Sequence, residues 1–460
     1  MSIRSTAGNP RGRLLALITA VGIVAAACGG GATSAPATSA PTTPAPGESA
    51  AAATPAAELE GKITFLHKYS DPRYAPYFEQ VVAAYMVENP KVEIEIQAES
   101  DQGVKDKLRI LAASNKLPDV YFSWAGDFTK KFVRGDLAKD LTGDVTGEWK
   151  DSFTPAALEA YTYDGKLYGV PITLDAKYMV YNKKLFADNS VPVPTTAEEL
   201  LAACDTFKSK GFEVPVTFGN VNGWPAIHFM TQLNPYFVPW ATLQTDYDPA
   251  TGAFTDPGYK AALDSFMDIN SRCLTPGANG ITHEAAQAQF LASKSPMHYI
   301  EAVEFFALTE KGGAPAELAN NWDFFVLPAP ASPVGDTGYL TGAPDGFLVN
   351  PSSEHIDIAV DFLAYLTSLD NAKKMVTDLG WLSPVQGSAT ADNTVPQNVT
   401  VIEDIAKAKG MAIWLDTVTH IDVANAYLNG VQALLDGTKT TDQVVADIQA
   451  AAVTAKASTQ

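Results

Sequence analysis

The sequence predicts an α/β fold, because strand and helix patterns alternate at short spacing through its first third. Residues 92–96 alternate apolar and acidic side chains, as a strand with one buried face does. Residues 76–88 carry apolar side chains at helical spacing, and Asn89-Pro90 ends that helix. This alternation indicates an α/β layer with a largely parallel sheet.

Two α/β patterns follow one another along the chain. The first alternates strands and helices at residues 62–66, 76–88, 92–96, 104–114 and 119–124. In the second, strands are expected at 168–172, 178–181, 214–218, 322–327 and 347–350, and helices at 195–210, 225–233 and 259–273. A threonine cap with two glutamates in the first turn begins the helix at 195–210. The C-terminal part is mostly helical, at 357–368, 371–379, 401–409, 423–436 and 441–455.

The N-terminus has the organisation of a secretory signal. Arginines precede an apolar run over residues 14–27 that ends in small residues directly before Cys28. Bacterial lipoprotein processing attaches a diacylglycerol to a cysteine in this position, so we expect residues 1–27 to be a signal peptide and Cys28 to be lipidated. A plain secretory signal is the alternative. Residues 28–57, rich in Ala, Thr, Ser, Pro and Gly, are expected to form a flexible tether.

Length and charge limit the class of protein. The chain of 460 residues leaves about 400 after the leader, which suits two domains better than one core. The formal net charge of −20 repels phosphate backbones, so we expect no nucleic-acid partner. No segment after the leader is long and apolar enough to span a bilayer, which leaves the lipid as the expected membrane anchor.

Cys204 and Cys273 are the two cysteines outside the leader, and each lies in an expected helix. Disulfides persist outside the cytoplasm, so a bridge between the two is one reading and a pair of buried free thiols is the other.

The sequence lacks the motifs of common cofactor and catalytic sites. It has no GxGxxG at a strand–helix junction, no P-loop, no HExxH, no CxxC pair and no GxSxG. The six histidines lack metal-ligand spacing. We therefore expect no cofactor, no metal and no enzyme activity. A pair of glycosidase carboxylates needs no sequence signature, so that alternative stays open.

Six segments in order resemble the family 1 extracellular solute-binding proteins, the sugar-capturing subunits of bacterial ABC importers. They are Leu-Pro-Asp-Val-Tyr-Phe-Ser-Trp at 117–124, Asp-Gly-Lys-Leu-Tyr-Gly-Val-Pro at 164–171 with its continuation to 186, and the segments 193–200, 290–297, 322–330 and 338–350. The resemblance implies a two-lobed, type II-like periplasmic-binding-protein fold with a ligand cleft between the lobes.

The resemblance also implies how the chain is divided. It places lobe 1 at residues 58–172 and 342–386, and lobe 2 at 173–341 and 387–460. Crossings between lobes are expected near 171–175, 341–346 and 381–387, where glycines and prolines can absorb the backbone rotation of closure.

A neutral sugar needs aromatic rings against its C–H faces and polar groups for its hydroxyls. Trp124 ends an expected strand before small residues, and Trp224 precedes Pro225 at a helix start, so both are candidates to contact the ligand. Packing within its own lobe is the alternative for Trp124. By resemblance, Trp414 is a third candidate.

Carboxylates near strand ends and crossings complete the candidate site. Asp175 and Asp345 lie at two expected crossings, where turn formation is the alternative role. Asp127 either contacts ligand or caps the next helix. His67, expected just past the first strand, is either a ligand contact or a solvated loop residue. The resemblance adds two further carboxylates, at Glu301 and Asp416.

The function expected from this resemblance is capture of a mono- or oligosaccharide by a lipid-anchored monomer that delivers it to a membrane permease with a separate ATPase. A cationic ligand such as a polyamine is the alternative among binding proteins, because acids and aromatics also suit ammonium groups. A secreted glycosidase is the alternative among enzymes.

Overall fold

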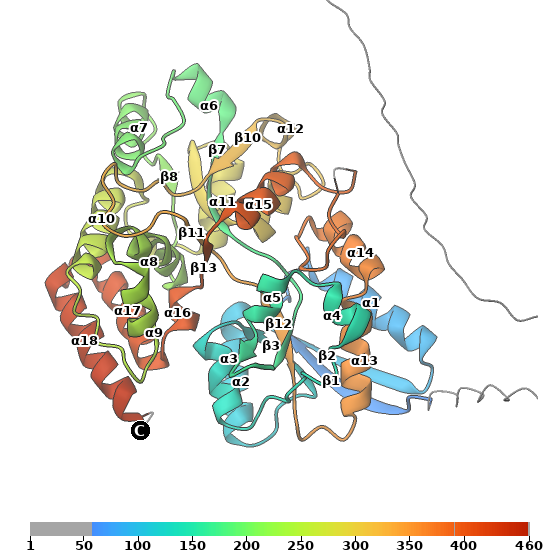
Figure 1. The fold of residues 1–460 in the computed structure, drawn as a ribbon. Coiled ribbons are helices and arrows are strands. Elements are labelled where there is room, and N and C mark those ends of the chain that lie inside the picture. Colours follow the sequence, from blue (N-terminus) through green and yellow to red (C-terminus); the bar gives the residue numbers. More distant parts are fainter. Residues whose placement is uncertain (1–57, 391, 459–460) are drawn as a thin grey trace, which may run out of the picture. The chain divides into compact units, whose positions relative to one another are not determined.

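The computed structural model describes residues 58–390 and 392–458. The predicted α/β fold is confirmed, and within residues 58–458 two separate main sheets each form the centre of one part of the fold, which we call lobe 1 and lobe 2 (Figure 1). Lobe 1 contains the five-stranded sheet β2-β1-β3-β12-β6 and lobe 2 the four-stranded sheet β10-β7-β9-β8.

Lobe 1 is built on a mixed sheet. Its strands are β1 (Gly61–His67), β2 (Val92–Ala98), β3 (Val120–Trp124), β6 (Gly169–Pro171) and β12 (Asp345–Val349). The helices of this lobe are α1 (Ala75–Glu88), α2 (Asp101–Ala113), α3 (Asp127–Arg134), α4 (Gly147–Asp151), α5 (Pro155–Glu159), α13 (Ile356–Leu366) and α14 (Leu369–Leu379), beside the hairpin of β4 (Thr162–Tyr163) and β5 (Lys166–Leu167). Strands β2, β1 and β3 are parallel neighbours as expected, whereas β12 is antiparallel to β3 and β6.

Lobe 2 is built on a second, shorter mixed sheet. Its strands are β7 (Lys177–Asn182), β8 (Val216–Thr217), β9 (Met297–Glu301) and β10 (Trp322–Phe325), with a separate pair, β11 (Tyr339–Thr341) and β13 (Gly410–Ala412). The helices around it are α6 (Lys183–Asp188), α7 (Ala197–Ser209), α8 (Trp224–Phe237), α9 (Trp240–Tyr247), α10 (Gly258–Cys273), η1 (Ala278–Gly280), α11 (His283–Leu291), η2 (Ala302–Leu308), α12 (Ala316–Ala319), α15 (Pro396–Lys407), α16 (Leu415–Val418), α17 (Ile421–Leu435) and α18 (Thr441–Ser458). Strand β9, which pairs with both β7 and β8, was not predicted from the sequence.

Each sheet has its own hydrophobic core. The core of lobe 1 includes Phe65, Phe122 and Phe347, and a larger cluster in lobe 2 includes Phe229 and Phe266. A third cluster lies against the other face of the lobe 2 strands. Separate cores allow each lobe to move as a unit.

Three chain segments run side by side between the lobes. The backbone N–H of Ile172 donates to Asp345 O at 2.7 Å, and that of Leu174 donates to Leu382 O at 2.6 Å. A side chain at Gly342 would overlap the backbone carbonyl of Asp175, so glycine permits this close approach. The segments expected to cross between lobes are therefore hydrogen-bonded to one another.

The disulfide left open by the sequence is present in the structure. Cys204 of α7 and Cys273 of α10 are bonded, with their Cα atoms 5.3 Å apart. The bridge fixes two helices of lobe 2 to one another. The alternative of two free thiols is wrong.

Candidate binding cavity between the lobes

A cavity of about 560 Å³ lies between the two sheets, and both lobes contribute its walls. Lobe 1 supplies the segment after β1, the start of α2, and the ends of β3 and β12 that face lobe 2. Lobe 2 supplies the starts of α8 and α11, the end of β9 and the segment that enters α16. Four tryptophans line the cavity: Trp124, Trp224, Trp381 and Trp414.

The lobe 1 side of the cavity joins an indole, a carboxylate and an ammonium group. Because β12 is antiparallel to β3, its first residue, Asp345, is the register partner of Trp124, the last residue of β3. Lys68 Nζ lies 2.9 Å from Asp345 Oδ2 and 5.2 Å from the Trp124 ring centroid. Burial raises the pKa of Asp345 although Lys68 opposes the shift. Tyr69 donates its hydroxyl to the same carboxylate at 3.2 Å.

The lobe 2 side presents a second fixed carboxylate. Lys177 begins β7 and Glu301 ends β9, and the two are register partners with Nζ 3.5 Å from Oε1. His228 Nδ1 lies 3.2 Å from the same Oε1. Burial favours the neutral acid, but Lys177, His228 and Lys68 outweigh it and hold the pKa of Glu301 well below its ordinary value. Glu301 is therefore a carboxylate, available as a hydrogen-bond acceptor.

Two tryptophans of lobe 2 are held by aromatic and cationic neighbours. Trp224 begins α8 beside Pro225, and its ring centroid lies 5.0 Å from His228 and 4.8 Å from His283. Trp414 precedes α16 and stacks on His228 at 4.2 Å. Trp224 is half-buried, whereas Trp414 is almost covered. Trp224 therefore exposes more of its ring to a ligand.

The sequence reading missed an aromatic wall at the third crossing. Trp381 packs 4.9 Å from both Tyr69 and Tyr74, and its Nε1 has no hydrogen-bond partner among the described residues. On the opposite side, His283 Nε2 lies 2.6 Å from Glu304 Oε1. Burial opposes ionisation there, but His283 outweighs it and lowers the pKa of Glu304 to about 2.

Three residues expected in the site lie outside the cavity wall that the described residues form. His67 is the last residue of β1 and faces the core with Phe65, so burial lowers its pKa to about 4. Asp127 lies in the first turn of α3 and pairs with Arg134 at 2.6 Å. Asp175 is buried at the first crossing, where burial and then Glu301 raise its pKa well above the ordinary value. These three side chains contact other parts of the chain and do not line the cavity, which corrects the expectation.

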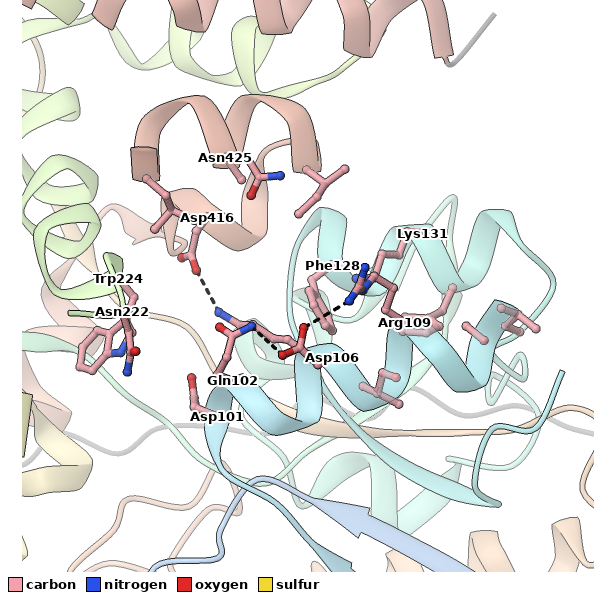
Figure 2. Close-up of a pocket in the computed structure, with 18 residues that line it drawn as sticks. Asp101, Gln102, Asp106, Arg109, Phe128, Lys131, Asn222, Trp224, Asp416 and Asn425 are labelled. Atoms are coloured by element: carbon pink, nitrogen blue, oxygen red, sulfur yellow. Dashed lines mark hydrogen bonds and ion pairs between the residues drawn. The ribbon is translucent and has the colours of Figure 1, made fainter. Parts of the chain in front are cut away.

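The lobes touch each other at one side of the cavity. Lys105 of α2 places Nζ 3.2 Å from Asp416 Oδ2 of α16, and a dashed line from the labelled Asp416 marks this contact in Figure 2. Gly126, at the start of α3, has a φ of 93° and lies so close to Thr417 that a side chain there would meet its backbone. Of the nine residues expected in the site, six therefore line the cavity: Trp124, Trp224, Glu301, Asp345, Trp414 and Asp416.

Other expectations concern metals and the membrane. Within residues 58–390 and 392–458, no cluster of three or more His, Cys, Asp or Glu side chains is arranged to hold a metal ion. The same part of the chain has no helix with the length and apolar character needed to cross a membrane. Cys28, the expected signal peptide and the expected tether lie outside the described residues.

Two lobes joined by three adjacent segments, with an aromatic and charged cavity between their sheets, define a two-lobed ligand-binding protein. The chain belongs to the bacterial extracellular solute-binding protein family, whose model matches residues 71–373. This family is defined by solute binding outside the cytoplasm and not by catalysis.

Individual relatives share sequence and fold with this chain. A binding protein of Brucella abortus is 28% identical over 323 residues, which cover 69% of this chain and 74% of the relative. The diacetylchitobiose-binding protein of Streptomyces coelicolor is 22% identical over 317 residues, 66% of this chain and 71% of the relative. A solved chitin oligosaccharide binding protein superimposes with a TM-score of 0.78 at 21% identity, covering 86% of this chain and 99% of that one. The two-lobed α/β fold predicted from the sequence is thereby confirmed.

Proposed function

We propose that this protein binds a mono- or oligosaccharide between its lobes and delivers it to the permease of an ABC importer that has a separate ATPase. The observation that carries the proposal is the cavity of about 560 Å³ with four tryptophans and fixed carboxylates in its walls. Indole rings suit the C–H faces of a sugar, and carboxylates accept charge-assisted hydrogen bonds from its hydroxyls. Diacetylchitobiose and chitin oligosaccharides, named for two relatives, support the carbohydrate class.

Three carboxylates in the cavity wall already have a basic neighbour, which favours a neutral ligand over a polyamine at these positions. Asp345 lies beside Lys68, Asp416 beside Lys105, and Glu301 beside Lys177 and His228. An ammonium group that approached any of these three carboxylates would have to displace an internal cation. A neutral sugar uses the same oxygens as acceptors without displacing their counter-ions.

Six residues are proposed to contact the ligand. Trp124 and Trp224 supply stacking surfaces from opposite lobes. Asp345 and Glu301, each at the end of a strand, accept hydrogen bonds from the hydroxyl groups of the sugar. Trp414 and Asp416 complete the lobe 2 wall. Binding to both lobes favours the closed arrangement over an open one, which is the state that a permease can select.

The proposal extends to the lobe boundaries and to the membrane. Lobe 1 comprises residues 58–172 and 342–386, lobe 2 comprises 173–341 and 387–460, and rotation occurs at the three segments between them. A diacylglycerol on Cys28 anchors the monomer to the outer face of the cell membrane, with residues 29–57 as the tether. Palmitate labelling of wild type and Cys28→Ala tests the anchor, because a plain secreted form incorporates no lipid.

Calorimetry against monosaccharides and oligosaccharides at low and high salt tests the ligand class. We expect a sugar to bind with micromolar affinity that barely changes with ionic strength, because no ionic contact with a neutral ligand is screened. Binding of a polyamine that weakens with salt would support the cationic alternative, and release of reducing sugar would support a glycosidase. The proposal is contradicted if every sugar tested has a Kd weaker than millimolar.

A further inference from the structure

A second cavity, of about 500 Å³, continues from the first one along the boundary between the lobes. The two cavities share Asp101, Gln102, Lys105, Asn222, Trp224 and Asp416 as lining residues. Helices α2 and α3 form one wall of the second cavity, and α17 forms the facing wall. Figure 2 shows Trp224 and Asn222 at one end of this space and Lys131 toward the other. A ligand seated against Trp224 can therefore continue past this residue and remain between protein walls.

The walls of the second cavity combine apolar surface with hydrogen-bonding groups. Phe128 and Leu428 line it, and so does Ile421, an exposed apolar residue at the start of α17. Gln102 and Asn425 add amide donors and acceptors to the same walls. A sugar ring likewise has apolar C–H faces and hydroxyl groups around its edge, so it can contact both kinds of group.

Two polar groups at this cavity have unused bonding capacity. The side chain of Asp416 is only 6% exposed, and Lys105 contacts its Oδ2 while its Oδ1 has no hydrogen-bond partner among the described residues. A buried acceptor without a donor is costly, and a ligand hydroxyl at the junction would satisfy it. Lys131 Nζ lies 3.4 Å from the Phe128 ring centroid and forms no ion pair within the described part of the chain. Desolvation there lowers its pKa to about 8.

We infer that the second cavity is a subsite for the distal units of an extended carbohydrate chain, an inference that rests on the proposed function. The proximal units occupy the first cavity, the chain passes Trp224 and Asp416, and the distal units lie against Phe128 between α2, α3 and α17. The protein therefore selects for oligosaccharides by length as well as by sugar type.

Calorimetry with malto-, xylo-, cello- and chito-oligosaccharides, each from the monosaccharide to the hexasaccharide, tests the subsite. For the series that binds, affinity rises beyond the disaccharide. Ile421→Ala, at a residue that lines only the second cavity, weakens binding of the hexasaccharide about threefold through loss of an apolar contact and leaves the disaccharide nearly unchanged. Asn425→Trp fills the cavity from α17, so the hexasaccharide binds this variant no more tightly than the disaccharide does.

Ile110→Ala is the matched control, because Ile110 is an exposed apolar residue of α2 that does not line either cavity. It leaves every affinity unchanged. Affinity that is independent of chain length, or equal weakening of short and long sugars by Ile421→Ala and Asn425→Trp, overturns the subsite while the proposed function stands. Failure of every series to bind overturns both.

Discussion

Lys177 and Glu301 face each other as register partners at the ends of two inner strands of the lobe 2 sheet, with Nζ 3.5 Å from Oε1. In the lobe 1 sheet, Trp124 and Asp345 are likewise register partners at the ends of two inner strands, β3 and β12. In both lobes, strand pairing therefore aligns a carboxylate with a cationic or aromatic neighbour at the rim of the cavity. The β-ladders fix the backbone at these positions, and Lys68 and Tyr69, after β1, add contacts to Asp345.

Replacement of Lys177 by Met is expected to destabilise the protein, because Lys177 is fully buried and Glu301 would lose its nearest lysine. Removal of one partner from a buried pair costs about 3 kcal/mol. Urea denaturation of Lys177→Met, Glu301→Gln and the double variant measures the coupling. The double variant should be more stable than the sum of the two single losses predicts. Simple additivity would show that the pair does not interact.

Replacement of Trp224 by Ala should lower sugar affinity about tenfold or more with little effect on melting, because its half-buried ring lines an open cavity. Trp322→Ala is the control in the core of lobe 2, where Trp322 is 2% exposed. Its truncation should cost about 3 to 5 kcal/mol of stability. Melting without ligand and calorimetry with ligand separate the two effects. A large melting loss with normal affinity for Trp224→Ala would remove this residue from the site.

Buried histidines should make the folded protein less stable as the pH falls. The pKa of His67 falls from about 6.5 to about 4 on folding, and that of His298 to about 3. Between pH 6.5 and 4 the unfolded chain therefore binds protons that the folded chain does not, and stability falls as pH falls. Each of these two histidines should lower the free energy of unfolding by about 1.6 kcal/mol between pH 6.5 and 5.

Chemical denaturation of wild type and His67→Gln at pH 7 and pH 5 checks this contribution. The variant should lose less stability than wild type over that interval, because position 67 no longer carries a group that titrates. Glu304, with its pKa lowered to about 2, loses its contribution only below its ordinary value of 4.5, outside this interval. An equal loss in both proteins would contradict the assignment to His67.

Gly342 should not tolerate a side chain, because a Cβ there would overlap the Asp175 carbonyl at the crossings. Gly342→Ala is expected to lose about 1 to 3 kcal/mol of stability through strain. Gly280→Ala is the matched control, since an added Cβ meets no heavy atom within 4 Å. Thermal melting compares the two variants. Equal melting temperatures would show that the backbone at the crossings can shift to accommodate a Cβ at position 342 without loss of stability.

The α/β fold could be predicted from the sequence, and so could several cavity residues that lie at the first or last position of a helix or strand. Trp124 closes a strand and Trp224 opens a helix with Pro225, so local patterns place both rings at element ends. Asp345 begins a strand in a segment with Gly and Pro, a pattern that also marks the crossing.

Other site features depend on strand ends and on pairing that the sequence does not reveal. His67 was expected after the first strand, but β1 includes it, and alternation turns it toward the core with Phe65. Lys177 was missed because the expected strand began one residue later, whereas β7 begins with this lysine. Trp381 reaches the cavity only through tertiary packing against Tyr69 and Tyr74.

A crystal structure of the protein with the oligosaccharide that binds most tightly in calorimetry tests the central claim most directly. The account predicts sugar density between the lobes, with rings against Trp124 and Trp224 and hydroxyls within hydrogen-bond distance of Asp345 and Glu301. Sugar bound on an outer face of either lobe, with the cavity between the sheets empty, would contradict it.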